Sequence, residues 1–487
     1  MGITVDGIRS VFSNIKIIKI VLLLWILYAL ITGVFIFIKP KEISIDFVNS
    51  FSVDDFYSEQ VGPDRGILMD NPLESGLARL KIIDSAKETL DISYFSIESG
   101  EAPNLFFGAL IDAADRGVKV NLLLDGIFYG LNGKFRSILY ILIDHPNMNL
   151  KLYEPLNLLK PWTLNNRMHD KYIIADESVA IMGGRNIGDK YFAPEWYEAN
   201  VTNDRDIIII NSKPGDTSSV IYQMSSYFNK IWNHEFSKPV KKRLFYIRTK
   251  RAMRKYEELR RKSNMAREEN QALFEQPINL MEISFPINKA SFIHNPLERF
   301  SKEPWCWYQI TELMKSSKES IFIQSPYIIP NKQMIEGYLD RYEPIDIDIT
   351  ALTNSLGSTP NLPAYSGYIR YRKKLIDSGI NVYEYQSRDS LHTKSFIIDD
   401  NLLAVGSFNS DPRSAYLSTE SMLIIHSSGA VEKIEENVQD FFDKSLLVDE
   451  DYSYLPKEGV AIEPVNPLKA FAIYALSYII RWFEFLL

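Results

Sequence analysis

The chain of 487 residues contains a single cysteine, Cys306, and six histidines. One cysteine excludes an intrachain disulfide and any zinc site built from several thiolates, so we expect Cys306 to be a small buried apolar residue. Basic residues are outnumbered by acidic ones, 54 against 62, for a formal net charge of −8. This balance argues against a protein whose whole surface binds nucleic acid. The length leaves room for two or three domains with a sizeable core.

Charged residues are absent from residues 20–38. A helix of that length extends about 28 Å at about 1.5 Å per residue, close to the roughly 30 Å of a bilayer core. No small-residue cleavage site follows, so we expect a retained anchor rather than a removed signal peptide. Basic residues favour the side before the anchor, which predicts a cytoplasmic N-terminus and a body on the outer face. They are Arg9, Lys16 and Lys19 before it, against Lys39 and Lys41 after it.

Two of the six histidines begin matching patterns. Each pattern reads His-x-Lys-x4-Asp. After six further residues, each continues with a glycine, a second small residue and, two positions later, an asparagine. Two copies of so long a pattern do not plausibly arise by chance. The copies are His169, Lys171, Asp176 and Asn186, and His392, Lys394, Asp399 and Asn409.

The spacing within each copy indicates the chemistry. Histidine and lysine are two positions apart, so their side chains share one face of a β-strand. The apolar runs behind them predict strands that are buried on both faces. An imidazole, an ammonium and an amide that converge from two strands form a site for an anion, most naturally a phosphate. One such pattern alone would be read as a solvent-facing strand, but two copies with matching tails favour a shared site.

The elements around the two copies repeat in the same order. The helix-to-strand passage that starts at residue 86 matches one that starts at residue 317, 231 positions later (317 − 86), and the two histidines are 223 positions apart (392 − 169). Such repetition indicates duplication of a whole α/β domain with mixed sheets flanked by helices. We expect a transmembrane anchor (1–41), a connector (42–75), a first α/β domain (76–237), a basic helical connector (238–290), a second α/β domain (291–450) and an amphipathic membrane-associated tail (451–487).

The paired patterns resemble those of the phospholipase D superfamily, whose members place two such signatures across one pseudo-two-fold active site. From about residue 75 to 430 the sequence is similar to bacterial cardiolipin synthases, especially the C-type. The resemblance implies two fused phospholipase D-like α/β domains and a location in the bacterial inner membrane. It is carried by Asn165-Asn166-Arg167-Met168-His169, Gly183-Gly184-Arg185-Asn186-Ile187-Gly188-Asp189, Leu352-Thr353-Asn354-Ser355-Leu356 and Gly406-Ser407-Phe408-Asn409-Ser410-Asp411-Pro412-Arg413-Ser414.

The same resemblance implies a ping-pong phosphodiester exchange. His169 is expected to attack phosphorus and become a phosphohistidine, while His392 protonates the departing alcohol and deprotonates the incoming one. The near symmetry of the copies leaves the reverse order open. Side-chain donors are expected to bind the non-bridging oxygens in place of a divalent cation, so no metal and no cofactor is expected. The donors are Lys171, Lys394, Asn186, Asn409 and Ser407; Gly184, at the position equivalent to Ser407, offers no hydroxyl.

Each histidine also needs an acceptor on its other ring nitrogen to hold its tautomer. Glu420 and Asp204 precede equivalent apolar strands and are the expected acceptors, with Asp206 as the alternative in the first copy. Asp176 and Asp399 complete the two catalytic signatures. We expect them to hold the strand and its loop rather than to contact substrate.

Two further segments are candidates for membrane contact. Residues 238–262 hold twelve basic and two acidic residues, which favours attachment to anionic lipid over a solvated helix face or a nucleic-acid groove. Residues 467–487 are apolar and aromatic but interrupted by charge. That composition favours a helix lying in the membrane interface over one docked on the core.

Four functions compete. The favoured one is a membrane-bound phosphatidyltransferase that makes cardiolipin from phosphatidylglycerol, alone or with a second donor such as phosphatidylethanolamine. A phospholipase D that hydrolyses phospholipids to phosphatidic acid would use the same residues with water as acceptor. The anchor and the acidic balance disfavour a nucleic-acid phosphodiesterase, and the intact signatures disfavour a non-enzymatic scaffold. The expected partners are phospholipids and the membrane; no nucleic acid is expected, and the sequence indicates no obligate protein partner.

Overall fold

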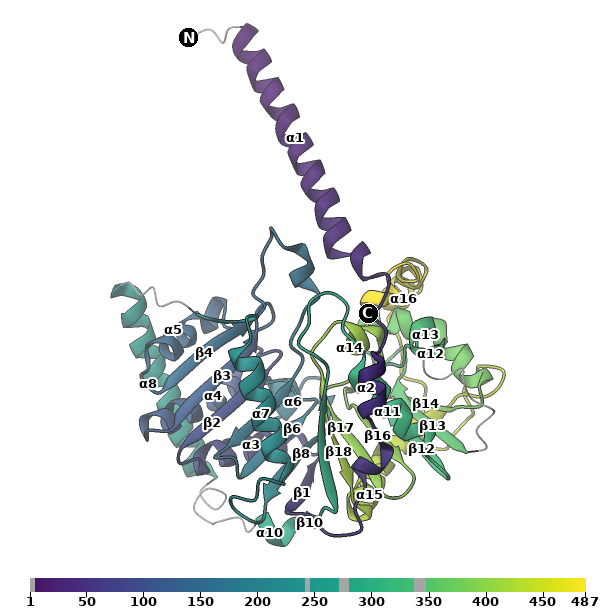
Figure 1. The fold of residues 1–487 in the computed structure, drawn as a ribbon. Coiled ribbons are helices and arrows are strands. Elements are labelled where there is room, and N and C mark those ends of the chain that lie inside the picture. Colours follow the sequence, from purple (N-terminus) through teal and green to yellow (C-terminus); the bar gives the residue numbers. More distant parts are fainter. Residues whose placement is uncertain (1–4, 241–245, 271–279, 337–346) are drawn as a thin grey trace.

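The computed structural model describes residues 5–240, 246–270, 280–336 and 347–487 (Figure 1). Its body consists of two mixed β-sheets covered by helices, and one long helix, α1 (Val5–Gly33), rises from it. The α/β architecture with two repeated domains, predicted from the sequence, is confirmed.

The first sheet has nine strands in the order β10-β1-β8-β6-β5-β2-β3-β4-β9. β2, β3 and β4 are parallel, and the other neighbouring pairs are antiparallel. The strands are β1 (Asp64–Met69), β2 (Thr89–Tyr94), β3 (Lys119–Asp125), β4 (Met148–Tyr153), β5 (Lys171–Ala175), β6 (Val179–Gly183), β8 (Asp206–Asn211), β9 (Ser237–Pro239) and β10 (Phe285–Pro286).

The second sheet has eight strands in the order β11-β18-β17-β16-β12-β13-β14-β19. Its run β18-β17-β16-β12-β13-β14 repeats β8-β6-β5-β2-β3-β4 of the first sheet, with the same parallel and antiparallel pairs. The strands are β11 (Lys289–His294), β12 (Ser320–Gln324), β13 (Asp348–Asn354), β14 (Asn381–Tyr385), β16 (Ser395–Ile398), β17 (Leu402–Gly406), β18 (Ser421–His426) and β19 (Ser445–Leu447).

Residues 42–75, expected to be a connector, contribute to both repeats. α2 (Ile45–Ser50) and η2 (Val53–Phe56) lie against the second repeat, where Phe56 is buried among the residues of its core. The chain then enters the first sheet as β1, which pairs with β8. Residues 42–75 are thus packed on the body and do not form a free linker between the anchor and the body.

Two of the covering helices begin at asparagine caps. Asn71 accepts the Glu74 N–H at the start of α3 (Pro72–Ser85), and Asn361 accepts the Ala364 N–H at the start of α13 (Leu362–Asp377). Both helices carry proline in the first turn, where its missing N–H costs nothing. The other helices of the body are α4 (Glu101–Asp115), η3 (Gly133–Phe135), α5 (Arg136–Asp144), η4 (Pro161–Leu164), α6 (Asp189–Phe192), α7 (Val220–Asn233), α10 (Leu280–Ile283), α11 (Trp305–Lys315), α12 (Lys332–Glu336), α14 (Pro412–Tyr416) and α15 (Ser428–Phe442).

One apolar core extends across both repeats. Tyr172 of β5 and Met182 of β6 share it with Val405 of β17 and Leu423 of β18. Each large apolar side chain so buried contributes about 1.5–3 kcal/mol of transfer free energy. This shared core holds the repeats together as one body.

Residues 246–262 of the basic stretch lie in α8 (Tyr246–Glu269), which packs on α4 and α5 at the flank of the first repeat, away from α1 (Figure 1). Several of its basic side chains contact acidic or polar groups there, so part of the positive charge of α8 is paired within the molecule. Residues 241–245 lie outside the described residues, and attachment of this stretch to lipid stays a prediction. The contacts are Lys255 with Asn104, Arg260 with Asp112, Lys262 with Glu101 and Arg267 with Asp84.

The C-terminal tail combines the two arrangements weighed for it. α16 (Pro467–Ile480) packs on α13, burying Ile473 and Ile480, and η5 (Glu484–Leu486) follows. Its opposite face is exposed and carries Phe471 and Tyr478. α16 lies close to the foot of α1 in Figure 1, so its exposed face is at the end of the molecule from which the anchor leaves.

Candidate active site

The two signature histidines lie where the repeats meet. The His169 N–H donates to the Thr419 carbonyl at 3.1 Å, and the His392 N–H donates to the Asn203 carbonyl at 2.7 Å. The residue before each histidine forms a β-bridge to the other repeat, so both histidines are held by the same interface. These bridges join Met168 to Thr419, and Leu391 of β15 (Ser390–Leu391) to Asn203 of β7 (Thr202–Asn203).

Each imidazole contacts a carboxylate of the opposite repeat. Nδ1 of His169 lies 3.0 Å from a carboxylate oxygen of Glu420, and Nδ1 of His392 lies 2.6 Å from Oδ2 of Asp204. Sequence reasoning selected both carboxylates but not the exchange of partners between the repeats. With Nδ1 so occupied, Nε2 of each imidazole is the nitrogen left for substrate.

Asp206, the alternative acceptor for the first copy, does not reach His169. Its carboxylate is buried between Arg79 at 2.9 Å and Arg185 at 2.7 Å, and it accepts the Ser75 hydroxyl at 2.6 Å. These contacts fix β8 to α3 and to the loop after β6. That alternative is therefore wrong.

The two buried carboxyl groups differ in pKa. Burial raises the pKa of Glu420 to about 8, with Lys171 only partly offsetting it. Burial also acts to raise the pKa of Asp204, but Lys394 and His392 outweigh it and hold the value at about 2. Asp204 is therefore held in its ionised form, whereas Glu420 keeps its proton to a much higher pH than a carboxyl group in water. Divergent values of this kind mark different chemical tasks for two similar groups.

The glycine-to-serine difference between the copies has a steric cause. A Cβ at Gly184 would collide with the Asp204 carboxylate, so no side chain fits in the first copy. In the second copy the Ser407 hydroxyl donates to Glu420 at 2.5 Å and is itself fully buried. Ser407 was expected to bind phosphate, but in the structure its hydroxyl binds and orients the carboxylate behind His169.

The two signature lysines are buried beside the histidines. Nζ of Lys171 donates to the His169 carbonyl and lies 5.3 Å from the centre of the Phe95 ring. Nζ of Lys394 donates to the His392 carbonyl and lies 2.7 Å from Nδ1 of the same histidine. Burial lowers the pKa of Lys171 to about 7 and that of Lys394 to about 8. Both ammonium groups become easier to neutralise than in water.

Both histidines have depressed pKa values. Burial and then the Lys171 ammonium hold the pKa of His169 well below its usual value. Burial and then Lys394 lower the pKa of His392 to about 3, against the opposing effect of Asp204. A neutral imidazole is the form that can attack phosphorus.

The signature asparagines each pair with a tyrosine hydroxyl that sequence reasoning missed. Nδ2 of Asn186 donates to Tyr191 at 3.1 Å, and Nδ2 of Asn409 donates to Tyr327 at 3.3 Å. The Tyr191 ring also lies 5.8 Å from the His392 ring. Tyr327 closely follows β12, and Tyr191 lies five residues after Asn186, so aromatic residues near the matched motifs were the available signal.

Asp176 and Asp399 hold backbone turns, as expected. The Asp176 carboxylate accepts the N–H groups of residues 87–89, and the Asp399 carboxylate accepts those of residues 318–320. These turns lead into β2 and β12. Both aspartates thereby tie the signature strand to its neighbour, at the end of the strand away from the histidine.

An aromatic pair flanks the first histidine. Phe95 lies 4.8 Å from His169 and 4.8 Å from Phe128, centre to centre, and Phe128 is 48 % exposed. The side chains of His169 and His392 are 14 % and 24 % exposed. The histidines thus reach solvent beside an apolar edge, a setting suited to an ester with hydrocarbon chains.

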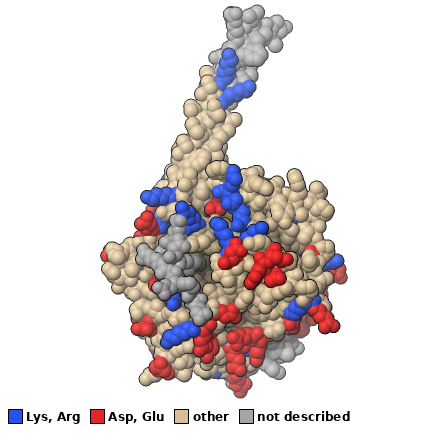
Figure 2. Space-filling model, turned by 90° about the vertical axis from the view of Figure 1, so that its right-hand side faces the viewer, with Lys and Arg blue, Asp and Glu red and all other residues tan. Residues whose placement is uncertain are grey.

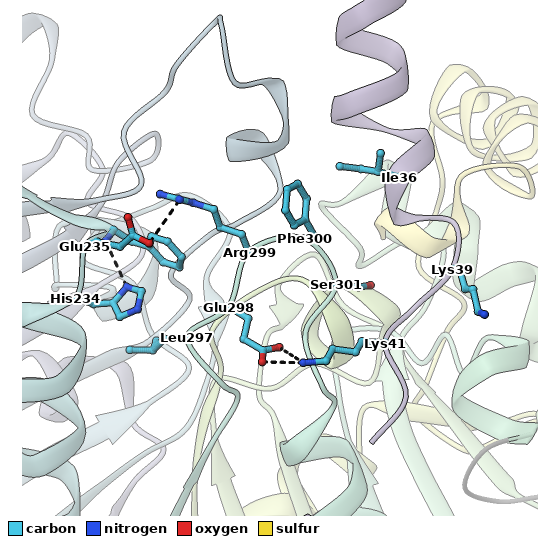
Figure 3. A pocket seen from close by; sticks show the side chains of 11 residues that line it. Ile36, Lys39, Lys41, His234, Glu235, Leu297, Glu298, Arg299, Phe300 and Ser301 are labelled. Atoms are coloured by element: carbon cyan, nitrogen blue, oxygen red, sulfur yellow. Dashed lines mark hydrogen bonds and ion pairs between the residues drawn. The ribbon is translucent and has the colours of Figure 1, made fainter. Parts of the chain in front are cut away.

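A cavity of about 630 Å³ lies beside the foot of α1 rather than at the histidines (Figure 3). Figure 3 shows Lys41 pointing to Glu298 and Arg299 lying beside Glu235 in its wall. Its charged groups are therefore largely paired with one another. Among the residues that the structure describes, no group of three or more His, Cys, Asp and Glu side chains is placed to hold a metal ion.

The sequence and the fold match known proteins. The family described as "Cardiolipin synthase, PLD-like domain" matches residues 80–232 and 310–442. Cardiolipin synthase C of Escherichia coli is 30% identical over 422 residues, covering 77% of this chain and 84% of the relative. An uncharacterized protein of Helicobacter pylori is 28% identical over 412 residues, covering 78% and 79%. The crystal structure of phosphatidylserine synthase from Haemophilus influenzae aligns with a TM-score of 0.59 at 15% identity, covering 87% of this chain and 95% of that one.

The duplicated α/β fold and the paired histidine signatures define an enzyme of the phospholipase D superfamily. Within it, the chain belongs to the cardiolipin synthase family of phospholipase D-like proteins. In the part of the chain that the structure describes, one helix, extending into η1 (Phe35–Phe37), is long and apolar enough to cross a membrane, over residues Lys16–Phe37. Together with the membership of this family, that helix places the enzyme at a membrane.

Proposed function

We propose that this enzyme makes cardiolipin by transphosphatidylation through a phosphohistidine intermediate. The observation that carries the proposal is one site in which two imidazoles from different repeats each contact a buried carboxylate of the other repeat. Phosphatidyl transfer in two steps needs one imidazole as nucleophile and a second as acid and base. The names of the cardiolipin synthase relatives support a phospholipid as substrate.

In the first step His169 attacks the phosphorus of phosphatidylglycerol through Nε2. The nitrogen–phosphorus bond forms as the bond to the glycerol oxygen breaks, and His392 as imidazolium gives that oxygen its proton. Asp204, ionised behind His392, stabilises the imidazolium. The negative phosphodiester adds a second charge that raises the pKa of His392 when substrate binds.

In the second step His392 acts as a base. It removes the proton of an acceptor hydroxyl, whose oxygen attacks phosphorus as the bond to His169 breaks, which restores the neutral imidazole of His169 and the imidazolium of His392. A second phosphatidylglycerol as acceptor gives cardiolipin, and water gives phosphatidic acid. Phosphatidylethanolamine as the donor would release ethanolamine through the same steps.

The negative charge on the transferred phosphoryl group must be stabilised by cations and hydrogen-bond donors. We assign Lys171 and Lys394 to the non-bridging oxygens, together with the amides of Asn186 and Asn409. The lysine ammoniums lie against the histidine carbonyls and exchange those contacts for phosphate when substrate binds. Fixed donors in a buried site stabilise charge more strongly than water does. Ser407 acts on the transferred phosphoryl group only indirectly, because its hydroxyl orients Glu420.

We further infer that α1 places the catalytic body outside the bacterial inner membrane. The bias of basic residues toward the N-terminal side of the anchor supports this orientation. A reporter that is active only outside the cytoplasm, fused after Leu487, should be active. Activity of a cytoplasm-only reporter at the same position would overturn the orientation.

Reconstitution tests the reaction. The purified chain in vesicles that contain phosphatidylglycerol should produce more cardiolipin than phosphatidic acid, measured by lipid extraction and chromatography. Expression in a host that lacks cardiolipin should restore the lipid. If phosphatidic acid is the main product, the enzyme is a hydrolase rather than a transferase. If neither product forms, phosphatidylglycerol is not the donor.

A further inference from the structure

The first repeat carries a loop that the second repeat lacks. His169 follows Tyr153, the last residue of β4, by 16 positions (169 − 153), whereas His392 follows Tyr385, the last residue of β14, by 7 positions (392 − 385). The symmetry of the repeats does not require the additional residues. They lie immediately before the first catalytic signature, and we name residues 155–165 the anchor loop.

The anchor loop contacts the transmembrane helix directly. The Tyr28 hydroxyl of α1 donates to the Leu159 carbonyl at 2.9 Å, and Nδ2 of Asn165 donates to the Gly33 carbonyl at 2.7 Å. Figure 1 shows the loop, between β4 and the first signature, rising from the body beside the lower turns of α1. Loop and helix thus extend from the body in the same direction.

The depth of this contact follows from the length of the helix. The part of α1 from Lys16 to Gly33 is about 27 Å long at about 1.5 Å per residue, slightly less than a bilayer core of about 30 Å, so a bilayer that α1 crosses takes up all of it. Tyr28 lies about 8 Å before Gly33 on the same scale. A bilayer crossed by α1 therefore also contains the tip of the anchor loop.

The side chains of the loop suit such a position. Leucines at four places in it are 48–75 % exposed: Leu156, Leu158, Leu159 and Leu164. Loops are ordinarily polar because they meet water, and a cluster of exposed leucines marks a surface that contacts lipid or protein. Contact of the loop with a helix that crosses a membrane selects lipid.

The backbone of the tip is also prepared for an apolar medium. The Leu159 N–H donates to the Asn157 side chain at 2.9 Å, and the Leu159 carbonyl is the group that accepts from Tyr28. The Lys160 N–H donates to the Asn157 carbonyl at 2.8 Å, and the Lys160 carbonyl accepts the Thr163 hydroxyl at 2.7 Å. Within a bilayer core, unsatisfied backbone groups are excluded by their cost. The N–H and carbonyl groups of Leu159 and Lys160 are all paired, within the loop or with α1.

The loop is tied firmly to the catalytic signature. The Arg167 guanidinium donates to the Glu154 carbonyl at 2.6 Å and to the Thr163 carbonyl at 2.7 Å, closing the base of the loop. It also donates to Asp125 at 3.1 Å at the end of β3. Two residues later the chain reaches His169, so the base of the loop is coupled to the segment that carries the histidine.

Other features of this end of the molecule agree. α16 lies near the foot of α1 (Figure 1). Leu468 in its first turn and Trp482, just beyond its end, are both exposed. Nη2 of Arg413 bridges from the carbonyl of Leu486, next to α16, to Asn165 in the anchor loop. In Figure 2 several Lys and Arg side chains gather around the foot of α1, and most acidic side chains on that face lie farther away. Basic groups at the membrane interface favour anionic lipid.

We propose that the anchor loop inserts into the acyl layer of the bilayer that α1 crosses, and holds the first signature at the lipid surface. This proposal deepens the proposed function, and its catalytic part rests on that function. Insertion places the His169 side of the site at the height of the phosphodiester groups. Substrate then reaches the site by lateral movement in the membrane rather than through water.

Fluorescence tests insertion without using activity. We would attach an environment-sensitive dye to Leu158→Cys, with Ile283→Cys as the matched control because Ile283 is also exposed, at 60 %, and lies on α10 at the opposite end of the body from α1. The native Cys306 is fully buried, and the labelled parent chain measures its background. In phosphatidylglycerol–phosphatidylcholine vesicles we expect dye at 158 to be quenched by brominated acyl chains and dye at 283 by aqueous iodide.

Three results would overturn insertion. Iodide quenching at 158 equal to that at 283 would place the loop in water. Shielding of the dye at 158 from both quenchers would place it against a protein partner or a second copy. Equal quenching by brominated lipid at both positions would overturn a membrane contact specific to the loop, because the opposite end of the body would then meet lipid just as closely.

Kinetics test the catalytic part. The double variant Leu158→Ser/Leu159→Ser should turn over vesicle phosphatidylglycerol at least five-fold more slowly, with turnover of monomeric short-chain phosphatidylglycerol unchanged. Ile283→Ser should change neither. Equal losses on both substrates would overturn delivery from the membrane. If no lipid is turned over by the wild type, the proposed function fails while the fluorescence result still decides insertion.

Discussion

At the scale of residues, the site depends on pairs that cross between the repeats. His169 is oriented by Glu420 and His392 by Asp204, and each carboxylate is buried. The pKa values of the two carboxyl groups diverge because lysine and histidine charges surround Asp204 closely, while burial dominates at Glu420. This asymmetry supports His392, with the ionised partner, as the acid and base.

Removal of either catalytic imidazole tests the shared site. We expect His169→Ala and His392→Ala each to lower turnover by at least about 100-fold, because nucleophile and acid act in sequence and neither replaces the other. His145→Ala is the matched control, since His145 pairs with Asp115 on the first repeat away from the signatures. Substantial phosphatidyl transfer by either catalytic variant would contradict one site built from both repeats.

Glu420 makes a testable contribution to stability. Its pKa is raised from 4.5 to about 8, chiefly by burial. The folded chain therefore keeps a proton that the unfolded chain releases, so the favourable contribution is complete below about pH 4.5 and is lost as pH rises through about 8. In Glu420→Gln this dependence is absent.

We expect the free energy of unfolding of Glu420→Gln, relative to the wild type, to increase between about pH 5 and pH 8. Denaturant unfolding in detergent at both pH values measures the difference. Other buried carboxyl groups with a raised pKa, among them Asp64, Asp125, Asp170 and Asp411, are present in both proteins, so to first order they cancel. An unchanged difference would show that Glu420 is ionised in the folded protein.

At the scale of elements, α16 separates a structural face from a functional one. Ile473 and Ile480 pack into the body, while Phe471, Tyr478 and Trp482 are exposed. Exposed aromatic side chains of this kind suit the membrane interface. The docked face explains why the helix is ordered against α13, and the exposed face remains available to lipid.

Replacing Phe471, Tyr478 and Trp482 together with serine should leave the fold intact and weaken membrane contact. We expect cardiolipin formation on vesicles to fall about three- to ten-fold and the share of phosphatidic acid to rise, because looser seating admits water to the phosphohistidine. Circular dichroism checks the fold, and chromatography gives the product ratio. An unchanged rate and ratio would assign α16 a purely structural role.

At the scale of the whole molecule, duplication supplies one catalytic site with two sets of donors. Four side chains, two ammonium groups and two amides, are proposed to bind the phosphoryl oxygens. A set of this kind can carry the charge that a divalent cation carries elsewhere. The absence of a metal requirement remains a prediction.

Phosphatidyl transfer in vesicles should therefore persist in excess EDTA, within about two-fold of the untreated rate. The enzyme is first dialysed against chelator, and initial rates are then compared with and without added Mg²⁺. Because divalent ions also alter the packing of anionic lipids, the same comparison is made with a monomeric short-chain substrate. Loss of turnover on both substrates, restored by Mg²⁺, would assign a metal to the chemical step.

The sequence by itself determined the duplicated α/β architecture, the anchor and most of the candidate site. These conclusions rest on local regularities, namely strand alternation, an uncharged run of bilayer length and a motif that occurs twice. Asp176 and Asp399 could be given a structural role for the same reason, since each acts on a turn that enters the neighbouring strand.

Only the tertiary structure decided how these parts combine. The exchange of Glu420 and Asp204 between the repeats, the use of Ser407 on Glu420 and the contacts of Tyr191 and Tyr327 depend on side chains brought together by a core that both sheets share. The anchor loop likewise shows little periodicity in its sequence. The contact between Leu159 and α1 is what indicates a membrane role for its leucines. Such contacts join positions that are distant in the sequence. The local spacing of residues does not indicate which of these positions a side chain contacts in the folded protein.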